Sequence, residues 1–555
     1  MAQAAGRDAG TRLFPGADAG VLAGFVAANL VLKLVLALSG INKGEYTDGI
    51  LQLLVFQVKA GLYPPLFGAL ATALSATGLD LETGGRIVSA VAGSLGLVPV
   101  YMIALRLRGP CAARYAALFY TVSPMILRWS VRVMTDALFF ALCAAALWLM
   151  MEAWMAARDA AQRRRADRLL AAATLFAALS ALTRYQGALL APLWLIPAAV
   201  FVWRARGLPW RALAASAVWL ALPAWMAWNG MVHSQQFRDR SGKDVVNSLL
   251  DYLNVAESFV YISPYYLGVP VFVLMVFGAA RLDRTRPFAR AFIWLSSLWG
   301  VAILVLQAMF QSSQYRYMMP VMPAVLSLAG VGAIAFEEHM KARGRKTLCS
   351  ALMLLGMLYL TVMSCAVLVF QRETFGEQRK AAQYIREFLP PGMPVLSNEQ
   401  YGPFTDLESV KLTWWSGRPV SIITPYISPD GSHPPERMLP VPCAVVLGDV
   451  YGGDPYTVTL TTQLNLYYHM RTVAGYYSTT YPVFDDVMVN PMFNQNPMGW
   501  VLRYKAQYFS TQVLVVDSMR TPEEMRELSR RQLVSPEAVS AVERHHDATG
   551  AEVPR

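Results

Sequence analysis

Apolar runs long enough to cross a lipid bilayer recur along most of this 555-residue chain. Crossing about 30 Å of hydrocarbon takes roughly 20 helical residues, and stretches that approach this length with few charges begin near residue 18. Hydrophobic residues make up 55% of the chain and charged residues only 15%, which is too apolar for an ordinary water-soluble enzyme. We therefore predict a polytopic α-helical membrane protein with about eleven spans, at residues 18–38, 87–105, 113–127, 137–154, 169–183, 187–203, 212–231, 264–280, 290–312, 318–336 and 347–370.

Basic residues cluster in the loops on one side of these spans. Residues 1–370 carry 32 of the 48 lysines and arginines but only 17 of the 37 acidic residues, so the net charge of +11 belongs to the apolar part. This distribution indicates membrane topology rather than nucleic-acid binding. By the positive-inside rule, the N-terminus and the basic loops are cytoplasmic and, after an odd number of spans, the C-terminus is periplasmic in a bacterial inner membrane. The clusters are Arg106/Arg108/Arg114, Arg158/Arg163/Arg164/Arg165/Arg168, Arg204/Arg206/Arg211, Arg281/Arg284/Arg286 and Lys341/Arg343/Arg345/Lys346.

The chain changes character after residue 370, which divides it into a membrane domain (1–370) and an exterior domain (371–555). The exterior part alternates a helical stretch, GEQRKAAQYIREFL, with the strand-like runs MPVLSN, CAVVLGDV and TQVLVVD. This alternation predicts a small α/β domain, followed by one or two charged helices over 521–545. The five cysteines include no CxxC pair, so neither a disulfide framework nor a zinc site is indicated.

Several ionisable residues lie where this topology places the exterior mouth of the membrane domain. Placing an ionisable side chain in or beside an apolar bundle costs free energy, so such residues usually have a specific role. Two acidic residues follow the first span, in an exterior loop over 39–86, and the others lie in short exterior turns. They are Glu45 and Asp48; Arg128, Arg132 and Asp136; Arg184; and Arg316.

Each of these residues also has an ordinary explanation. Glu45 and Asp48 could be surface acids of a hydrated loop, and Asp136 could simply cap a helix. Arg184 and Arg316 could extend toward lipid headgroups. Their convergence on one face favours a site instead, because guanidinium groups bind phosphate oxygens bidentately and an arginine-rich, partly apolar cavity suits a lipid-linked phosphate. A nearby carboxylate suits activation of a hydroxyl group.

The ordered motifs over residues 18–340 resemble those of GT-C fold membrane glycosyltransferases, the protein O-mannosyltransferases and lipid A aminoarabinose transferases (families 39 and 83) among them. The motifs are an acidic first exterior loop (GEYTDG), a PPL turn, a TD pair opening the fourth span, an LTR-x-x-G hairpin and an RYxxPxxP segment. Each motif alone is unspecific, whereas their order on a matching topology is fairly specific. The acids of the loop are separated here, where the family often has adjacent Asp-Glu, so either can match the catalytic acid.

The resemblance implies an inverting glycosyltransferase that moves a hexose or pentose from a polyprenyl-monophosphate carrier to a periplasmic lipid, glycan or protein. Asp48, at the expected start of a helix, would be the base; Glu45, in a more polar stretch expected to face solvent, is its alternative. Asp136 would orient substrate hydroxyls. The carrier phosphate would be bound by Arg184, Arg316, Arg132 and Arg128, and further substrate contacts would come from Tyr63 and Tyr317.

Such donors require no nucleotide, which agrees with the lack of a phosphate-binding glycine loop. We expect no cofactor, and a divalent metal is not supported, because Leu62 and Tyr63 stand where the aminoarabinose branch has a metal-contacting glutamate. Membrane lipids are expected partners and nucleic acids are not. Two other classes stay open: a polytopic transporter, which predicts polar or broken helices at the bilayer midplane, and a membrane-anchored sensor or assembly protein with a ligand-binding exterior domain.

Overall fold

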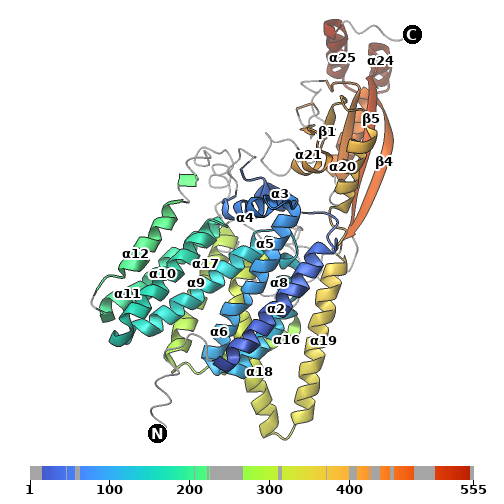
Figure 1. The fold of residues 1–555 in the computed structure, drawn as a ribbon. Coiled ribbons are helices and arrows are strands. Elements are labelled where there is room, and N and C mark those ends of the chain that lie inside the picture. The colour runs from blue at the N-terminus through green and yellow to red at the C-terminus, as the bar shows by residue number, and fades with distance from the viewer. Residues whose placement is uncertain are drawn as a thin grey trace, which may run out of the picture. The chain divides into compact units, whose positions relative to one another are not determined.

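The computed structural model describes residues 16–45, 47–56, 63–205, 207–221, 224–225, 267–309, 315–370, 372–398, 409–423, 425–426, 438–449, 455–480 and 507–549. These residues form two compact units (Figure 1). The bundle unit takes its described residues from 1–41 and 51–369. The tail unit combines residues 42–50 with described parts of 370–485 and 504–555.

The bundle unit is built from helices that coincide with the predicted apolar runs (Figure 1). Within the described ranges, seven helical segments are long and apolar enough to cross a membrane, which confirms the multi-pass helical fold. The helices are α2 (Gly16–Leu38), α4 (Leu66–Ser75), α5 (Leu81–Leu95), α6 (Leu97–Arg108), α7 (Pro110–Thr121), α8 (Pro124–Ser130), α9 (Asp136–Ala157), α10 (Arg163–Ala181), α11 (Leu190–Ala205), α12 (Trp210–Ala215), α16 (Val269–Ala280), α17 (Pro287–Met309), α18 (Met322–Ala342) and α19 (Lys346–Phe370).

One predicted span, 113–127, is wrong as a single helix. Helix α7 ends at Thr121 and α8 begins at Pro124. The Ser123 hydroxyl accepts a hydrogen bond from the Ile126 amide, and Pro124 occupies the first turn, so these two residues start a new helix. With twelve residues, α7 is about 18 Å long and too short to cross the hydrocarbon core unaided. Of the predicted span 212–231, α12 and η3 (Ser216–Leu220) cover the first part, and most of the rest lies outside the described residues.

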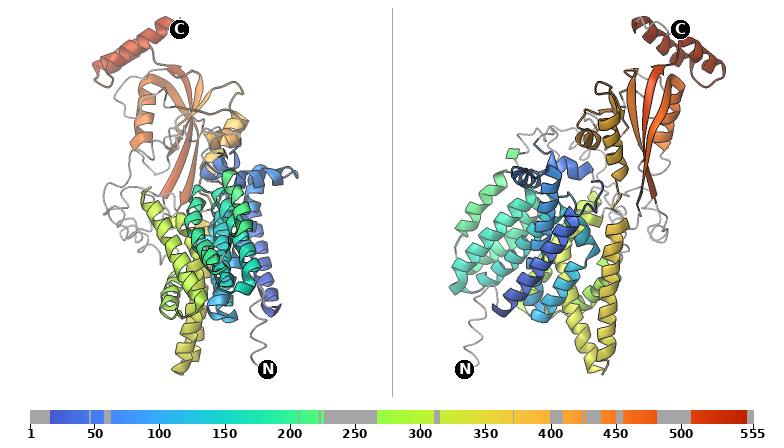
Figure 2. Two further views of the ribbon diagram at one scale, coloured as in Figure 1. Left: turned by 90° about the vertical axis from the view of Figure 1, so that its left-hand side faces the viewer. Right: turned by 45° about the vertical axis from the view of Figure 1, so that its right-hand side comes forward.

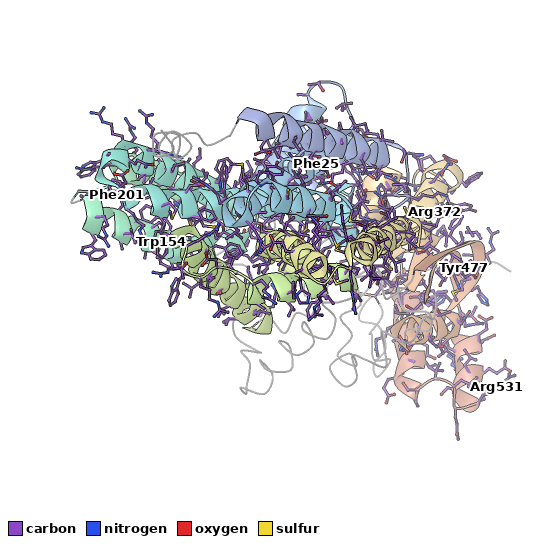
Figure 3. The ribbon with its side chains drawn as sticks, turned by 90° about the horizontal axis from the view of Figure 1, so that it is seen from below. Phe25, Trp154, Phe201, Arg372, Tyr477 and Arg531 are labelled. Carbon is purple, nitrogen blue, oxygen red and sulfur yellow. The ribbon has the colours of Figure 1, made fainter. Side chains whose placement is uncertain are left out.

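Helix α9 is central to the bundle unit, and α2 and α19 are peripheral. Helix α9 contacts α10, α5, α11, α17 and α6. In its most apolar stretch 78% is buried, whereas the corresponding share is 22% in α2 and 17% in α19. Contacts run from α2 through α5 and α9 to α11, so Phe25 of α2 and Phe201 of α11 lie far apart when the helices are seen from below (Figure 3). The peripheral helices therefore present apolar side chains to lipid.

The tail unit contains a five-stranded mixed sheet with the strand order β2-β1-β3-β5-β4. Strand β1 pairs in parallel with β2 and β3, and β5 pairs antiparallel with β3 and β4. The predicted strand-like runs lie on β1, β3 and β5. Strand β4 was missed because glycine, threonine and tyrosine interrupt any apolar run in this edge strand. The strands are β1 (Val395–Ser397), β2 (Ser421–Ile422), β3 (Cys443–Asp449), β4 (Tyr468–Thr480) and β5 (Gln507–Met519).

Helices cover both faces of this sheet (Figure 2, left). Side chains along β3 alternate between the faces, as a strand requires. Cys443 and Val445 pack into a core with α22 (Pro455–Tyr467), α24 (Pro522–Arg530) and α25 (Pro536–Thr549). Ala444 and Val446 pack into the other core with α20 (Gly376–Phe388) and α21 (Val410–Ser416). The predicted α/β character of the tail is confirmed, and α24 and α25 are the predicted charged helices.

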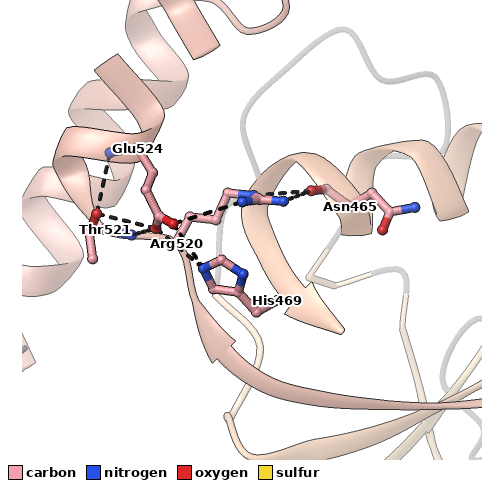
Figure 4. A network of polar contacts seen from close by, with 5 residues as sticks. All are labelled: Asn465, His469, Arg520, Thr521 and Glu524. Carbon is pink, nitrogen blue, oxygen red and sulfur yellow. Dashed lines mark hydrogen bonds and ion pairs between the residues drawn. The ribbon is translucent and has the colours of Figure 1, made fainter. Parts of the chain in front are cut away.

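A polar network fixes the start of α24 (Figure 4). The Thr521 hydroxyl accepts a hydrogen bond from the Glu524 amide, and the Glu524 carboxylate accepts one from the Thr521 amide, forming a capping box. His469 of β4 lies 3.2 Å from Glu524, and Arg520 donates two hydrogen bonds to the Asn465 carbonyl. The network therefore ties the helix to the end of the sheet.

Candidate active site

A pocket of about 230 Å³ opens in the bundle unit among α9, α17 and the 3-10 segments η2 (Tyr185–Leu189) and η5 (Tyr315–Val321). Its apolar wall includes Phe139, Ile303, Met319 and Pro320. Its polar lining consists of Asp136, Arg184, Gln186, Arg316 and Tyr317. Four predicted site residues, from three distant parts of the sequence, thus share one pocket, whereas Gln186 was not predicted.

Asp136 and Arg184 form a buried ion pair at this pocket. Arg184 Nη1 donates a hydrogen bond to Asp136 Oδ1, with side chains 10% and 1% exposed. Asp136 lies in the first turn of α9, as the ordinary explanation expects, but its carboxylate also pairs with Arg184, which therefore does not extend toward headgroups. Within the described part of the chain, Asp136 Oδ2 and the neighbouring Thr135 Oγ1 are buried without a hydrogen-bond partner. A buried acceptor of this kind is costly unless a ligand satisfies it.

The backbone around Arg184 explains the TRxxG motif. Arg184 is extended (φ −149°, ψ 140°) between α10 and η2. Gly187 then packs so closely on α10 that a Cβ atom there would lie 2.4 Å from the Ala181 nitrogen. The Leu66 amide, next to the PPL turn, donates to the Leu182 carbonyl at 2.9 Å. Glycine is therefore required for close approach, and the PPL turn anchors the hairpin that carries Arg184.

Tyr317 lies between the two arginines of the pocket. Its ring centroid is 4.9 Å from the Arg184 guanidinium carbon and 5.0 Å from that of Arg316. Its hydroxyl accepts a hydrogen bond from Arg316 Nη2 at 3.2 Å. On the far side of η5, Trp299 Nε1 donates to the Pro320 carbonyl at 2.9 Å. The aromatic ring stabilises two guanidinium groups near one another, and the proline-rich segment holds this ring in place.

Arg128 and Arg132 belong to the next layer, on α8 and the turn after it. The guanidinium carbons of Arg128 and Arg316 lie 4.5 Å and 5.5 Å from the ring centroid of Trp129. Arg128 and Arg132 are 4% and 1% exposed, so both are buried cations rather than headgroup anchors. Of the predicted arginines, only Arg184 and Arg316 line the pocket.

The predicted acidic residues of the first exterior loop belong to the tail unit. Asp48 lies in the first turn of α3 (Thr47–Leu53), as predicted, and is 9% exposed. Glu45 is 0% exposed, so the expectation that it faces solvent is wrong. The preceding residues, Lys43 and Gly44, contact residues 372–375 of the tail, more than 300 residues away, and local polarity does not reveal such packing. Tyr63, which belongs to the bundle unit, accepts a hydrogen bond on its carbonyl from Trp225 Nε1 at 3.3 Å.

Two polar residues missed by the sequence analysis support the pocket. Thr135 precedes Asp136, and its amide donates to Gln52 Oε1 at 2.9 Å, which fixes the start of α9. The signal for Thr135 was present in the TD pair, whereas nothing in the sequence distinguishes Gln52 or Gln186. Among the described residues, no group of three histidine, cysteine or acidic side chains is close enough to hold a metal ion.

Comparison with known proteins places this geometry in a fold class. Residues 63–228, which include Asp136 and Arg184, match the family model described as dolichyl-phosphate-mannose-protein mannosyltransferase. A search of curated proteins gives no significant match.

Solved structures give the wider likeness. ArnT from Cupriavidus metallidurans is similar in the apo state (TM-score 0.50) and bound to undecaprenyl phosphate (0.52), with 17% identity, 81% of this chain and 96% of that chain covered. The oligosaccharyltransferase of Archaeoglobus fulgidus in its apo form is similar with a TM-score of 0.50 and 12% identity, 81% of this chain and 69% of that chain covered. This chain therefore has the GT-C fold of membrane glycosyltransferases and resembles ArnT and the protein mannosyltransferases.

Proposed function

We propose that the protein is a membrane glycosyltransferase that moves a sugar from a polyprenyl-monophosphate carrier to an acceptor hydroxyl. The observation that carries this proposal is the pair of buried guanidinium groups, Arg184 and Arg316, that flank Tyr317 in a pocket beside Asp136. An apolar bundle has no structural need for two arginines in one small pocket. A similar fold binds undecaprenyl phosphate in ArnT, which supports a lipid phosphate as the ligand.

The charges of the pocket suit a departing phosphate. Arg184, Arg316 and Asp136 together give one net positive charge, which matches the single negative charge of a sugar phosphodiester. As the bond between the anomeric carbon and the phosphate oxygen breaks, the phosphate gains negative charge. Preformed guanidinium donors therefore stabilise the transition state more than the ground state, which is the requirement for catalysis.

The other polar atoms of the pocket have complementary tasks. Asp136 Oδ2, without a partner among the described residues, accepts a hydrogen bond from a hydroxyl of the sugar or the acceptor. In the inverting reaction, the acceptor oxygen attacks the anomeric carbon, the carrier phosphate leaves, and the acceptor proton passes to Asp48. Asp48 is preferred over Glu45 because it lies at the start of α3 and keeps some exposure, whereas Glu45 has none.

The membrane topology is part of the proposal: the pocket faces the periplasm of a bacterial inner membrane, with the N-terminus in the cytoplasm. The basic loops, Lys341 to Lys346 among them, support it through the positive-inside rule. Reporter fusions after Arg343 and after Gln371 should report the cytoplasm and the periplasm, respectively. If both report the cytoplasm, the periplasmic reaction is ruled out.

The activity itself is tested with purified protein in lipid nanodiscs. The probes are synthetic polyprenyl-phosphate hexoses and pentoses with labelled sugars, offered together with cell-envelope lipid, glycan and protein fractions. We expect one labelled acceptor and stoichiometric release of polyprenyl phosphate. Movement of an intact sugar lipid across the bilayer of proteoliposomes, without bond cleavage, would favour the transporter. Binding without cleavage or movement would favour the sensor or assembly protein.

A further inference from the structure

The acidic loop that follows α2 packs against the beginning of the tail. The Lys43 amide donates to the Arg372 carbonyl at 2.8 Å, and Arg379 Nη1 donates to the Lys43 carbonyl at 3.5 Å. Lys43 Nζ also forms an ion pair with Glu373 at 2.8 Å. Both backbone polar groups of Lys43 and its side chain are thus engaged by one segment, residues 372–379.

Gly44 makes this contact too close for any other residue. A Cβ atom on Gly44 would lie 2.5 Å from the Phe375 carbonyl carbon and 2.6 Å from the carbonyl oxygens of Phe375 and Thr374. These are backbone atoms, which cannot rotate away as a side chain can. Glycine at this position is therefore explained by contact with residues 374–375 alone, since no positive φ is recorded for Gly44.

The tail side of the contact is itself rigid. Phe375 has φ 60°, a left-handed conformation that is strained for a bulky residue and persists only where its surroundings enforce it. Lys411 Nζ lies 3.8 Å from the centre of its ring. On the next turn, Glu377 is 1% exposed and accepts a hydrogen bond from Ser478 of β4. The segment is thus held by α21 and by the sheet.

We propose that residues 372–376 of the tail position the acidic loop for catalysis, with Gly44 and Lys43 as positioning residues and Asp48 as the group they place. This inference rests on the proposed glycosyl transfer and gives the tail unit a catalytic task. Glu45, fully buried between Gly44 and α3, belongs to the packed part of the loop. The residues that line the phosphate pocket all belong to the other unit, so we expect disturbing the loop to change turnover more than carrier binding.

The first experiment compares Gly44→Ala with Gly392→Ala in the full-length protein in nanodiscs. Gly392 belongs to the same unit, and a Cβ atom there would meet nothing within 4 Å. We expect Gly44→Ala to lower kcat at least about tenfold, since a displacement of about 1 Å can reduce rates on the order of 100-fold. The KM for the sugar lipid and the binding of undecaprenyl phosphate should stay unchanged, and Gly392→Ala should behave as wild type.

Hydrogen exchange separates this inference from the proposed function. Amides of residues 42–50 should exchange faster in Gly44→Ala than in wild type, whatever reaction the protein catalyses. An inactive wild type with every sugar lipid contradicts the glycosyl transfer, whereas unchanged exchange at 42–50 contradicts the positioning. Wild-type kcat in Gly44→Ala, or equal losses of kcat and carrier binding, would also overturn it.

A charge-reversal pair decides the question if Gly44→Ala does not fold. Lys43→Glu and Glu373→Lys should each lower kcat about two- to fivefold, because a partly exposed pair contributes little. The double variant should recover most of the loss, since it restores opposite charges. Additive losses in the double variant would show that the ion pair does not position the loop.

Discussion

Two ion pairs, one in each unit, differ strongly in burial. In the bundle unit, Asp136 and Arg184 are 1% and 10% exposed and satisfy each other beside aromatic rings. In the tail unit, Glu524 and His469 are 39% and 45% exposed and fasten a helix start in contact with water. A pair surrounded by apolar side chains must offset a large desolvation cost, whereas an exposed pair contributes little either way. The buried pair beside the pocket therefore indicates function, whereas the exposed pair indicates local structure.

The largest expected effect comes from Asp48, a residue of the tail unit to which we assign the proton transfer. Asp48→Asn retains size and hydrogen bonding but removes the base, and a positioned base contributes roughly 100- to 10,000-fold. We expect kcat to fall at least about 100-fold while undecaprenyl phosphate still binds. Single-turnover kinetics with a verified sugar lipid measures the chemical step directly.

Glu45→Gln is the matched control for Asp48→Asn, since it removes the other carboxylate of the same loop. We expect a much smaller loss of kcat. An inactive Gln variant beside an active Asn variant would exchange the two roles. Full turnover in both would show that the base lies elsewhere.

The next effect sharpens the comparison inside the bundle unit. Arg184→Ala and Arg316→Ala should each remove roughly 2–4 kcal/mol of transition-state stabilisation, or about 30- to 900-fold in kcat/KM. Lysine should restore activity only in part, because it lacks the bidentate fork. Arg204→Ala is the control, since Arg204 stacks on the exposed Trp203, outside the pocket. Wild-type kinetics in both pocket variants would assign these arginines a structural role.

A smaller effect is expected on stability in the tail unit. Thr521→Ala removes the side-chain half of the α24 capping box (Figure 4) and should destabilise this helix by about 1 kcal/mol. Hydrogen exchange of the α24 amides in the full-length protein measures the change, and Ser540→Ala on α25 is a control with only an i−4 bond. A large loss of kcat in Thr521→Ala would contradict the assignment of this network to local structure.

The smallest effect depends on pH. Burial raises the pKa of Glu524, but hydrogen bonds from the Thr521 amide and the His469 ring outweigh it, so the pKa lies below its ordinary value. Because the folded-state pKa is lowered, the ionised carboxylate stabilises the fold at pH values above the unfolded-state pKa of about 4.3. This stabilisation is lost as the pH falls through the folded-state pKa. Glu524→Gln should therefore weaken α24 by a few tenths of a kcal/mol at pH 7 and not at all at a pH well below the folded-state pKa. An equal difference at both pH values would contradict an ionic contribution.

The sequence was sufficient for the parts of the fold that depend on local composition. Apolar length predicted the helices, and the convergence of exterior turns placed Asp136, Arg184 and Arg316 together before any coordinates. The contacts among these side chains could not be predicted from the sequence. Asp136 and Arg184 are separated by 48 residues, and nothing local indicates that Tyr317 lies between two guanidinium groups. The need for glycine at position 44 arises from residues 374 and 375, far along the chain. The break between α7 and α8, by contrast, could have been predicted, because Ser123 and Pro124 are typical of a helix start.

The contact between Gly44 and the tail also means that the acidic loop can pack only after the tail has been synthesised. The acidic loop is synthesised about 330 residues before the segment that packs against it, which takes on the order of 15–65 s at the usual rate of translation. During that interval the remaining spans must be inserted into the membrane while the loop is without its packing partner. On the proposed mechanism, a chain interrupted before residue 372 would hold Asp136, Arg184 and Arg316 but would lack the segment that positions Asp48. If the tail positions Asp48 as proposed, glycosyl transfer begins only after the tail has folded.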